Sequence, residues 1–340
     1  MQKLKSFYPL IMLMSTIPLF AQENTNDFYD NSETHLLPGN TLIQVTGEVK
    51  QRGTIDLLTL PLRSVIVKEA RLAGDSNEFT GAYRYDGYSL YDILNGFLPD
   101  KYNQAEFQPI IDLYVTIENA TGERVLFSWG EIYYPIHRHE IIIATKVSRI
   151  VPSKTGELWP LPAEMRLVAA HDLLTERNIS SPVSIIVHSS PLPFRVNRDL
   201  KPLYAPEIGV YRQDMLLDKI EVPDPALTAM EYESIFYGKG RGIHSTTPFS
   251  GTMLKDVLRP VLAMNRDLLR TGLLVVSAAD GYRAVYSCSE VFNRNDQAEV
   301  LLIYDKNNQD GGVFRLFPSA DFFSDRAVKA VDGIWLIRAE

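Results

Sequence analysis

Cysteine is almost absent from this chain, since Cys288 is the only one among its 340 residues. A single cysteine cannot form an internal disulfide, so we expect stability to rest on hydrophobic cores. It also excludes a metal site built from several thiolates. Basic residues are in the minority, with 34 Lys and Arg against 42 Asp and Glu and a formal net charge of −8. That balance argues against nucleic acid as a partner, because such binding depends on a basic surface.

Long hydrophobic runs are also lacking, and the most apolar stretch is too short to span a bilayer comfortably. It covers residues 7–20, follows Lys3 and Lys5, and is followed by a small residue, Ala21. This pattern is typical of a signal peptide. We predict a signal peptide over residues 1–21, cleavage before Gln22, and an exported protein, periplasmic or secreted, with no transmembrane segment after signal removal. The alternative is an uncleaved anchor helix.

The remaining chain repeats itself, which the order of its motifs makes visible. Residues 86–94 read DGYSLYDIL and residues 250–258 read SGTMLKDVL, so both contain Gly-x-x-Leu-x-Asp-[Ile/Val]-Leu. Their apolar residues recur at i, i+3 and i+4, which predicts one helical face, with Leu90 and Leu254 buried. Gly87 and Gly251 are interpreted as tight turns that open these helices.

Further matches follow in the same order in both halves. Residues 114–133 and 274–293 each predict a β-hairpin, since two β-rich runs flank a Gly turn. Residues 165–187 match residues 314–336 without a gap, including an Asp and an Arg five apart in each half. The predicted organisation is a flexible leader, a first copy, a Pro-rich linker and a second copy, with these boundaries: 22–40, 41–188, 189–206 and 207–340.

This series of motifs resembles the molybdopterin-binding domain of the sulfite oxidase family. Asp280-Gly281-Tyr282 and Arg315-Leu316 are the segments most similar to that family. The resemblance implies an α+β fold of mixed β-sheets with short helices, present in two copies. It also implies a molybdenum held by one cysteine thiolate, a soft ligand that suits the metal.

The sequence departs from the family at that ligand. Leu72 stands about where the first copy should have its cysteine, and residues 232–242 contain none in the second copy. Cys288 aligns with Trp129 in the hairpin and is interpreted as a small buried hydrophobe. We therefore expect no bound cofactor, although molybdopterin is not excluded.

Two segments are candidate sites. The stretch from Tyr237 to His244 alternates glycine with basic residues, so converging backbone N–H groups and positive charge predict a site for a small anion such as a phosphate or a pterin. A solvated loop joining strand to helix is the alternative. The predicted ligand-binding residues are Gly238, Lys239, Gly240, Arg241, Gly242 and His244.

The other candidate is His137, His139 and Glu140, because two histidines on one face of a strand with an adjacent carboxylate can hold a divalent ion. A surface loop is the alternative there. The Asp172–Arg177 and Asp321–Arg326 pairs are interpreted as scaffold salt bridges, since they recur in both halves.

No catalytic residue is predicted, because no nucleophile elbow, phosphate loop or His-Glu-x-x-His helix occurs in the chain. The preferred function is a non-catalytic binding or interaction protein, whose partner is a small anionic ligand or another protein. A molybdopterin-dependent oxidoreductase and a periplasmic metal-binding accessory protein are the alternatives.

Overall fold

The computed structural model describes residues 33–74, 76–152, 154–308 and 311–338. The predicted signal peptide and its cleavage site lie outside these residues. In the described part, no helix is long and apolar enough to cross a membrane.

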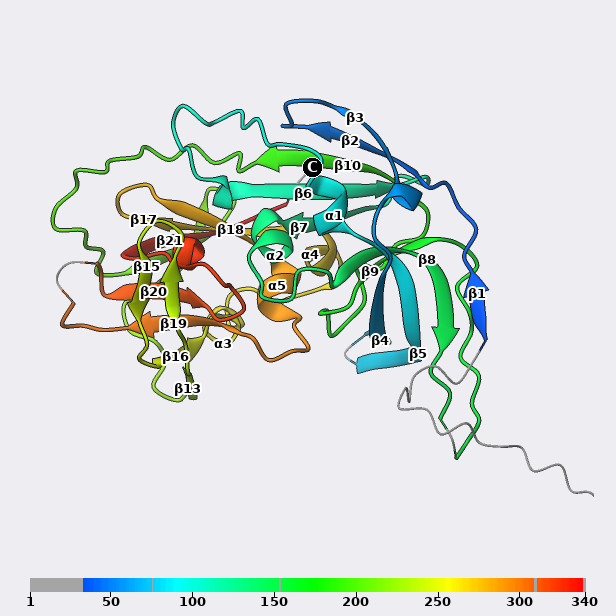
Figure 1. Ribbon diagram of the computed structural model, residues 1–340. Helices are drawn as coiled ribbons and strands as arrows, with labels where there is room; N and C mark the ends of the chain where they lie inside the picture. The colour runs from blue at the N-terminus through cyan, green and yellow to red at the C-terminus, as the bar shows by residue number, and fades with distance from the viewer. Residues whose placement is uncertain (1–32, 75, 153, 309–310, 339–340) are drawn as a thin grey trace, which may run out of the picture.

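The first half of the chain, on the right in Figure 1, contains ten strands and two α-helices among its described residues. They are β1 (Thr34–Leu36), β2 (Leu42–Gly47), β3 (Gly53–Asp56), β4 (Arg63–Ala73), β5 (Ser76–Ser89), α1 (Leu90–Leu94), β6 (Leu113–Asn119), β7 (Arg124–Ser128), α2 (Trp129–Tyr133), β8 (Ile141–Arg149), β9 (Arg166–Ala169) and β10 (Pro182–Ser189). Short 3-10 turns cover Leu57–Thr59 and Ile110–Asp112.

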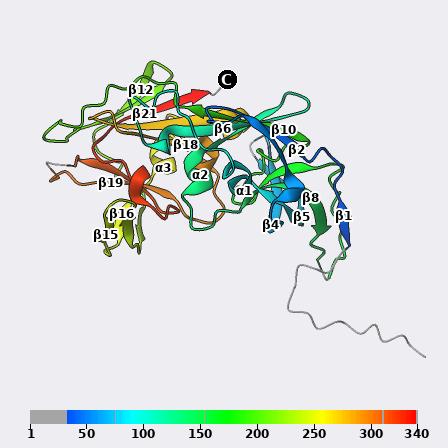
Figure 2. The same ribbon diagram turned by 45° about the horizontal axis from the view of Figure 1, so that its top comes forward.

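The second half, on the left in Figures 1 and 2, follows after a stretch without strands. Its elements are β11 (Ile208–Arg212), β12 (Met215–Ile220), β13 (Ala229–Tyr232), β14 (Phe236–Gly238), β15 (Gly242–Ser245), β16 (Phe249–Met253), α3 (Leu254–Leu258), α4 (Arg266–Thr271), β17 (Gly272–Ala278), β18 (Arg283–Ser287), α5 (Cys288–Phe292), β19 (Val300–Tyr304), β20 (Phe314–Pro318) and β21 (Val331–Arg338). A 3-10 turn covers Ser324–Arg326.

The two halves have the same strand order in their sheets. The order β3-β2-β10-β6-β7 in the first half corresponds to β12-β11-β21-β17-β18 in the second. In both, the central strand is parallel to one neighbour, β10 to β2 and β21 to β11, and all other pairs of the sheet are antiparallel. The other sheet repeats as well, with β4-β5-β8-β9 matching β13-β16-β19-β20.

The predicted α+β, sulfite-oxidase-like fold class is wrong. The structure is mostly β, with 45% strand and 12% helix, and its small sheets are arranged like a four-bladed β-propeller. That fold class was inferred from the family resemblance, whereas the short helices that the periodicity predicted are present at Leu90–Leu94 and Leu254–Leu258. The helices α1, α2 and α5 each have five residues and begin directly where a strand ends. The last strand residue is a serine in each case, and its hydroxyl accepts a hydrogen bond from a backbone N–H in the first turn of the helix; these serines are Ser89, Ser128 and Ser287.

Several local predictions are confirmed. Leu90 and Leu254 are fully buried in the helices α1 and α3. The hairpins form as β6–β7 and β17–β18. Gly87 plays a different part from the one predicted, because it lies within β5 and not in a turn. A Cβ there would come within 2.2 Å of the Ile143 carbonyl oxygen, so glycine permits the close approach of β8.

The predicted leader is partly structured, since it contains β1, which pairs with β8.

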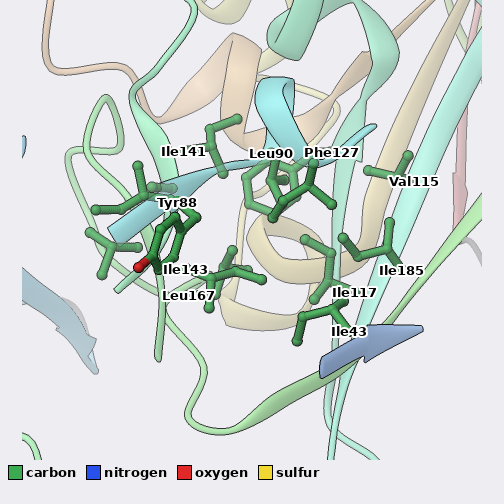
Figure 3. Packing of buried hydrophobic residues seen from close by; sticks show 14 of the residues in the cluster. Ile43, Tyr88, Leu90, Val115, Ile117, Phe127, Ile141, Ile143, Leu167 and Ile185 are labelled. Atoms are coloured by element: carbon green, nitrogen blue, oxygen red, sulfur yellow. The ribbon is translucent and has the colours of Figure 1, made fainter. Parts of the chain in front are cut away.

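Each half has its own core. Side chains from both sheets of the first half meet there (Figure 3), including Ile43 of β2, Ile117 of β6 and Ile143 of β8. The second core also takes in Phe107 and Tyr134 from the first half, so the halves share apolar contacts.

Candidate functional site

A cleft of about 630 Å³ lies where the two halves meet, a size typical of ligand sites. One wall comes from the outer strand β4 of the first half and another from the loop before β8. The second half contributes the loop after α5. The lining residues are Ser64, Val65, Ile66, Lys68, Ile136, His137, Arg138, His139, Glu140, Ala170, Asn295 and Asp296.

Arg138 is held in place by an aromatic ring. Its guanidinium carbon lies 4.8 Å from the centre of the Tyr91 ring, and its Nη1 donates to the Tyr91 hydroxyl at 3.1 Å. Within the described residues, neither Arg138 nor Lys68 forms an ion pair with a carboxylate. The cleft therefore offers two cationic groups that a ligand can engage.

His139 belongs to a polar cluster at the end of the cleft. Its Nδ1 lies 3.0 Å from the Ser89 hydroxyl and 3.5 Å from Asp92 Oδ2. Burial lowers the pKa of His139, and the neighbouring Arg63 lowers it further, against the attraction of Asp92. Burial opposes ionisation of Asp92, but hydrogen bonds from Arg63 and Ser89 outweigh it and hold its pKa below the usual range. At neutral pH this cluster therefore contains a neutral imidazole and an ionised carboxylate.

The carboxylates on the cleft wall are Glu140 and Asp296. Asp296 is neutralised by Arg294, whose Nε donates to it at 2.8 Å. Burial opposes the ionisation of Asp296, but the bonds from Arg294 keep its pKa below the usual range. Because Lys68 and Arg138 have no carboxylate partner among the described residues, the wall is slightly basic in a protein that is acidic overall.

An aromatic pocket of about 320 Å³ adjoins this cleft. It is lined by Tyr133, Tyr134, Pro135, Ile136, Arg138, Phe322 and Phe323. Ile136 and Arg138 line both spaces and connect them. Ile136 and Phe322 leave 65% and 51% of their surface exposed, so this junction has an unusual apolar surface. The combined site can bind an anion that also has an apolar body.

The predicted Gly-rich site is a β-hairpin and not a loop that joins a strand to a helix. Gly238 ends β14, Gly242 begins β15, and Lys239, Gly240 and Arg241 form the exposed turn between them. A Cβ on Gly238 would lie 2.3 Å from Nε2 of His244, so the imidazole packs directly over this glycine. The basic side chains extend from the exposed hairpin, and its anion site stays a prediction.

The predicted metal residues lie in an irregular segment before β8, not on a strand. They line the cleft together, but His139 is engaged by Ser89 and Asp92. Among the described residues, no group of three or more His, Cys, Asp or Glu is placed to hold a metal ion. His137, His139 and Glu140 line the wall of the cleft, and metal binding by them stays a prediction.

The predicted Asp–Arg scaffold pairs form in both halves and meet in a buried cluster. Arg177 Nη2 lies 2.6 Å from Asp172, and Arg326 Nη2 lies 2.6 Å from Asp321. All four side chains are at most 2% exposed.

Sequence reasoning missed the partners that connect the halves. Arg177 also contacts Glu131 and the Ser287 hydroxyl of the other half, and Ser128 donates to Glu290 at 2.7 Å. The Ser-x-x-Glu pattern at 128–131 and 287–290 was a visible signal, since it forms a capping box in both halves.

Cys288 is fully buried, as predicted, although it opens α5 instead of lying on the hairpin strand. Burial raises the pKa of its thiol to about 12. Leu72 lies on β4, where its backbone N–H donates to Glu176 and its carbonyl accepts from Arg266. These residues do not fit a metal held by an accessible thiolate.

No family model and no curated protein matches this chain. The site must therefore be interpreted from its own geometry.

Proposed function

We propose that this is an exported, non-catalytic binding protein whose ligand or partner occupies the cleft between its two halves. The observation that supports it best is the junction of the polar cleft and the aromatic pocket at Ile136 and Arg138. An anionic group would bind Arg138 and Lys68, and an apolar body would contact the exposed ring of Phe322.

The position of Arg138 favours binding by a preformed site. Its stacking and hydrogen bond with Tyr91 fix the guanidinium before any ligand arrives, so less side-chain entropy is lost on binding. The nearby histidine is a neutral hydrogen-bonding group and adds no positive charge of its own at neutral pH.

The experiment uses 8-anilinonaphthalene-1-sulfonate, an anion with an aromatic body, as a fluorescent probe. We expect Arg138→Ala to weaken binding about tenfold, which corresponds to 1.4 kcal/mol. Arg52→Ala is the matched control, because Arg52 is an exposed arginine outside the cleft lining. Phe322→Ser should also weaken the signal, through the apolar pocket. Equal binding by the Arg138 and Arg52 variants would refute the proposed site.

A further inference from the structure

The cleft is bordered by a strand that ends its sheet. In the order β1-β8-β5-β4, β4 pairs with β5 on one side only. Its second part is covered, since the Ala70 carbonyl accepts from Thr175 N at 2.7 Å and Leu72 N donates to Glu176 at 2.7 Å. Its first part borders the cleft, which is lined there by Ser64, Val65, Ile66 and Lys68.

The backbone groups of this first part point away from β5 at every second residue. In an antiparallel pair, successive residues alternate between facing the partner strand and facing away. Ala70 and Leu72 face away from β5, so Ser64, Ile66 and Lys68 do as well. The register shift between β4 and β5 skips Thr80 on β5, which leaves the alternation along β4 intact.

Within the described residues, no hydrogen bond reaches these outward groups. Ser64, Ile66 and Lys68 each offer one N–H and one C=O, which is the pattern that an added strand requires. Their side chains also line the cleft, and Ile66 is 48% exposed.

We propose that the occupant of the cleft is an extended, acidic segment of a partner protein, which adds to β4 as a further strand. This inference rests on the proposed binding function and specifies its ligand. Directly opposed residues of neighbouring strands lie on one face. An apolar residue of the segment would therefore pack on Ile66, and an acidic residue two positions away would pair with Lys68.

The rest of the cleft agrees with this occupant. Arg138 supplies a second cation in the cleft, and Asn295 of the second half also lines it, with its amide nitrogen bonded to the Ala170 and Asp172 carbonyls. The edges β7 and β18 are different, because they lie against one another between the halves. The N-terminal part of β4 is thus a long edge that opens into a cleft with charge to select its partner.

A library of seven-residue peptides displayed on phage tests the proposal on the whole protein. We expect selected peptides to have an apolar residue and an acidic residue two positions apart, opposite Ile66 and Lys68. Ile66→Pro should reduce their binding at least about tenfold, because proline removes the outward N–H. Ile66→Thr is the matched control, since it keeps that N–H and the strand preference. Lys68→Glu should reverse the preference toward basic peptides.

Hydrogen exchange on the unsubstituted protein gives a second measurement that does not depend on the folding of a variant. A bound peptide should slow exchange of the Ile66 and Lys68 amides and leave the Val65 and Val67 amides, which already bond to β5, unchanged. Selected peptides without this spacing, or equal binding by Ile66→Pro and Ile66→Thr, would overturn the added strand.

The two proposals fail separately. If Arg138→Ala weakens the fluorescent probe but no peptide depends on the Ile66 amide, the cleft is a binding site of another kind. If neither variant changes any binding, the cleft itself is not the site. Association of two copies of this chain through β4, seen as a dimer that Ile66→Pro abolishes, would also overturn the peptide as occupant.

Discussion

Replacing Arg177 with methionine should destabilise the protein severely, because its guanidinium lies at the centre of the buried charges between the halves. It is fully buried and donates to Asp172 at 2.6 and 2.8 Å and to Glu131 at 3.0 and 3.1 Å. It also bonds to the Leu126 carbonyl and to the Ser287 hydroxyl. Methionine fills similar space but leaves both carboxylates without their cation.

The expected loss is about 3–5 kcal/mol, the usual result of removing one partner from a buried ion pair. Glu131 makes the reasoning specific. Its complete burial raises the free energy of its charged form, yet Arg177 and His171 outweigh that effect and hold its pKa below the usual range. Without Arg177, burial dominates and the pKa of Glu131 should rise instead.

The pH dependence therefore changes sign. In the unsubstituted protein, the folded pKa of Glu131 is depressed, so its contribution is complete above its ordinary pKa of 4.5 and is lost as the pH falls below that value. In Arg177→Met, the raised pKa means that stability should increase as the pH falls from 7 toward 5.

Urea unfolding at pH 7 and pH 5, followed by circular dichroism, measures both effects. Arg177→Met combined with Glu131→Gln should recover part of the loss at pH 7, since it removes one uncompensated charge. Arg124→Met is the matched control, because Arg124 is exposed and pairs only with Glu118 in the described structure. A loss below about 1 kcal/mol for Arg177→Met, or no recovery at pH 5, would refute this account of the cluster.

Three further predictions follow from buried residues and from the N-terminus. Leu90→Ala and Leu254→Ala should each cost about 2–5 kcal/mol in urea unfolding, because both side chains are fully buried in equivalent helices; a loss below about 1 kcal/mol in either would contradict the shared core role. The Cys288 thiol, whose pKa burial raises to about 12, should not react with a thiol reagent at pH 8 in the folded protein but should react fully in urea. Fast reaction without denaturant would show that the sulfur is accessible. N-terminal sequencing of the exported protein should begin at Gln22, and a chain that keeps Met1 in the membrane fraction would show that the signal peptide is misassigned.

The sequence by itself determined the local elements. The two-residue period of a strand and the 3.6-residue period of a helix can both be recognised within a few residues. The hairpins and the burial of Leu90 and Leu254 could therefore be predicted. These windows did not decide the fold class, which was inferred from the family resemblance. How the short strands group into sheets depends on pairings between distant segments, which only the structure shows.

Only the tertiary structure decided what lies at the junction of the halves. Ser287 and Arg177 are 110 positions apart, and Ser128 and Glu290 are 162 apart, so no local pattern indicates that they touch. The histidines before β8 looked like metal ligands because their spacing is that of one strand face. The structure places them in an irregular segment before β8 begins at Ile141, where His139 contacts Ser89 and Asp92 at the end of the cleft. The backbone of β4 became a candidate binding edge for the same reason. Which strand ends a sheet depends on how all the strands pair, and pairing is set by contacts between distant segments and not by the residues of β4 alone.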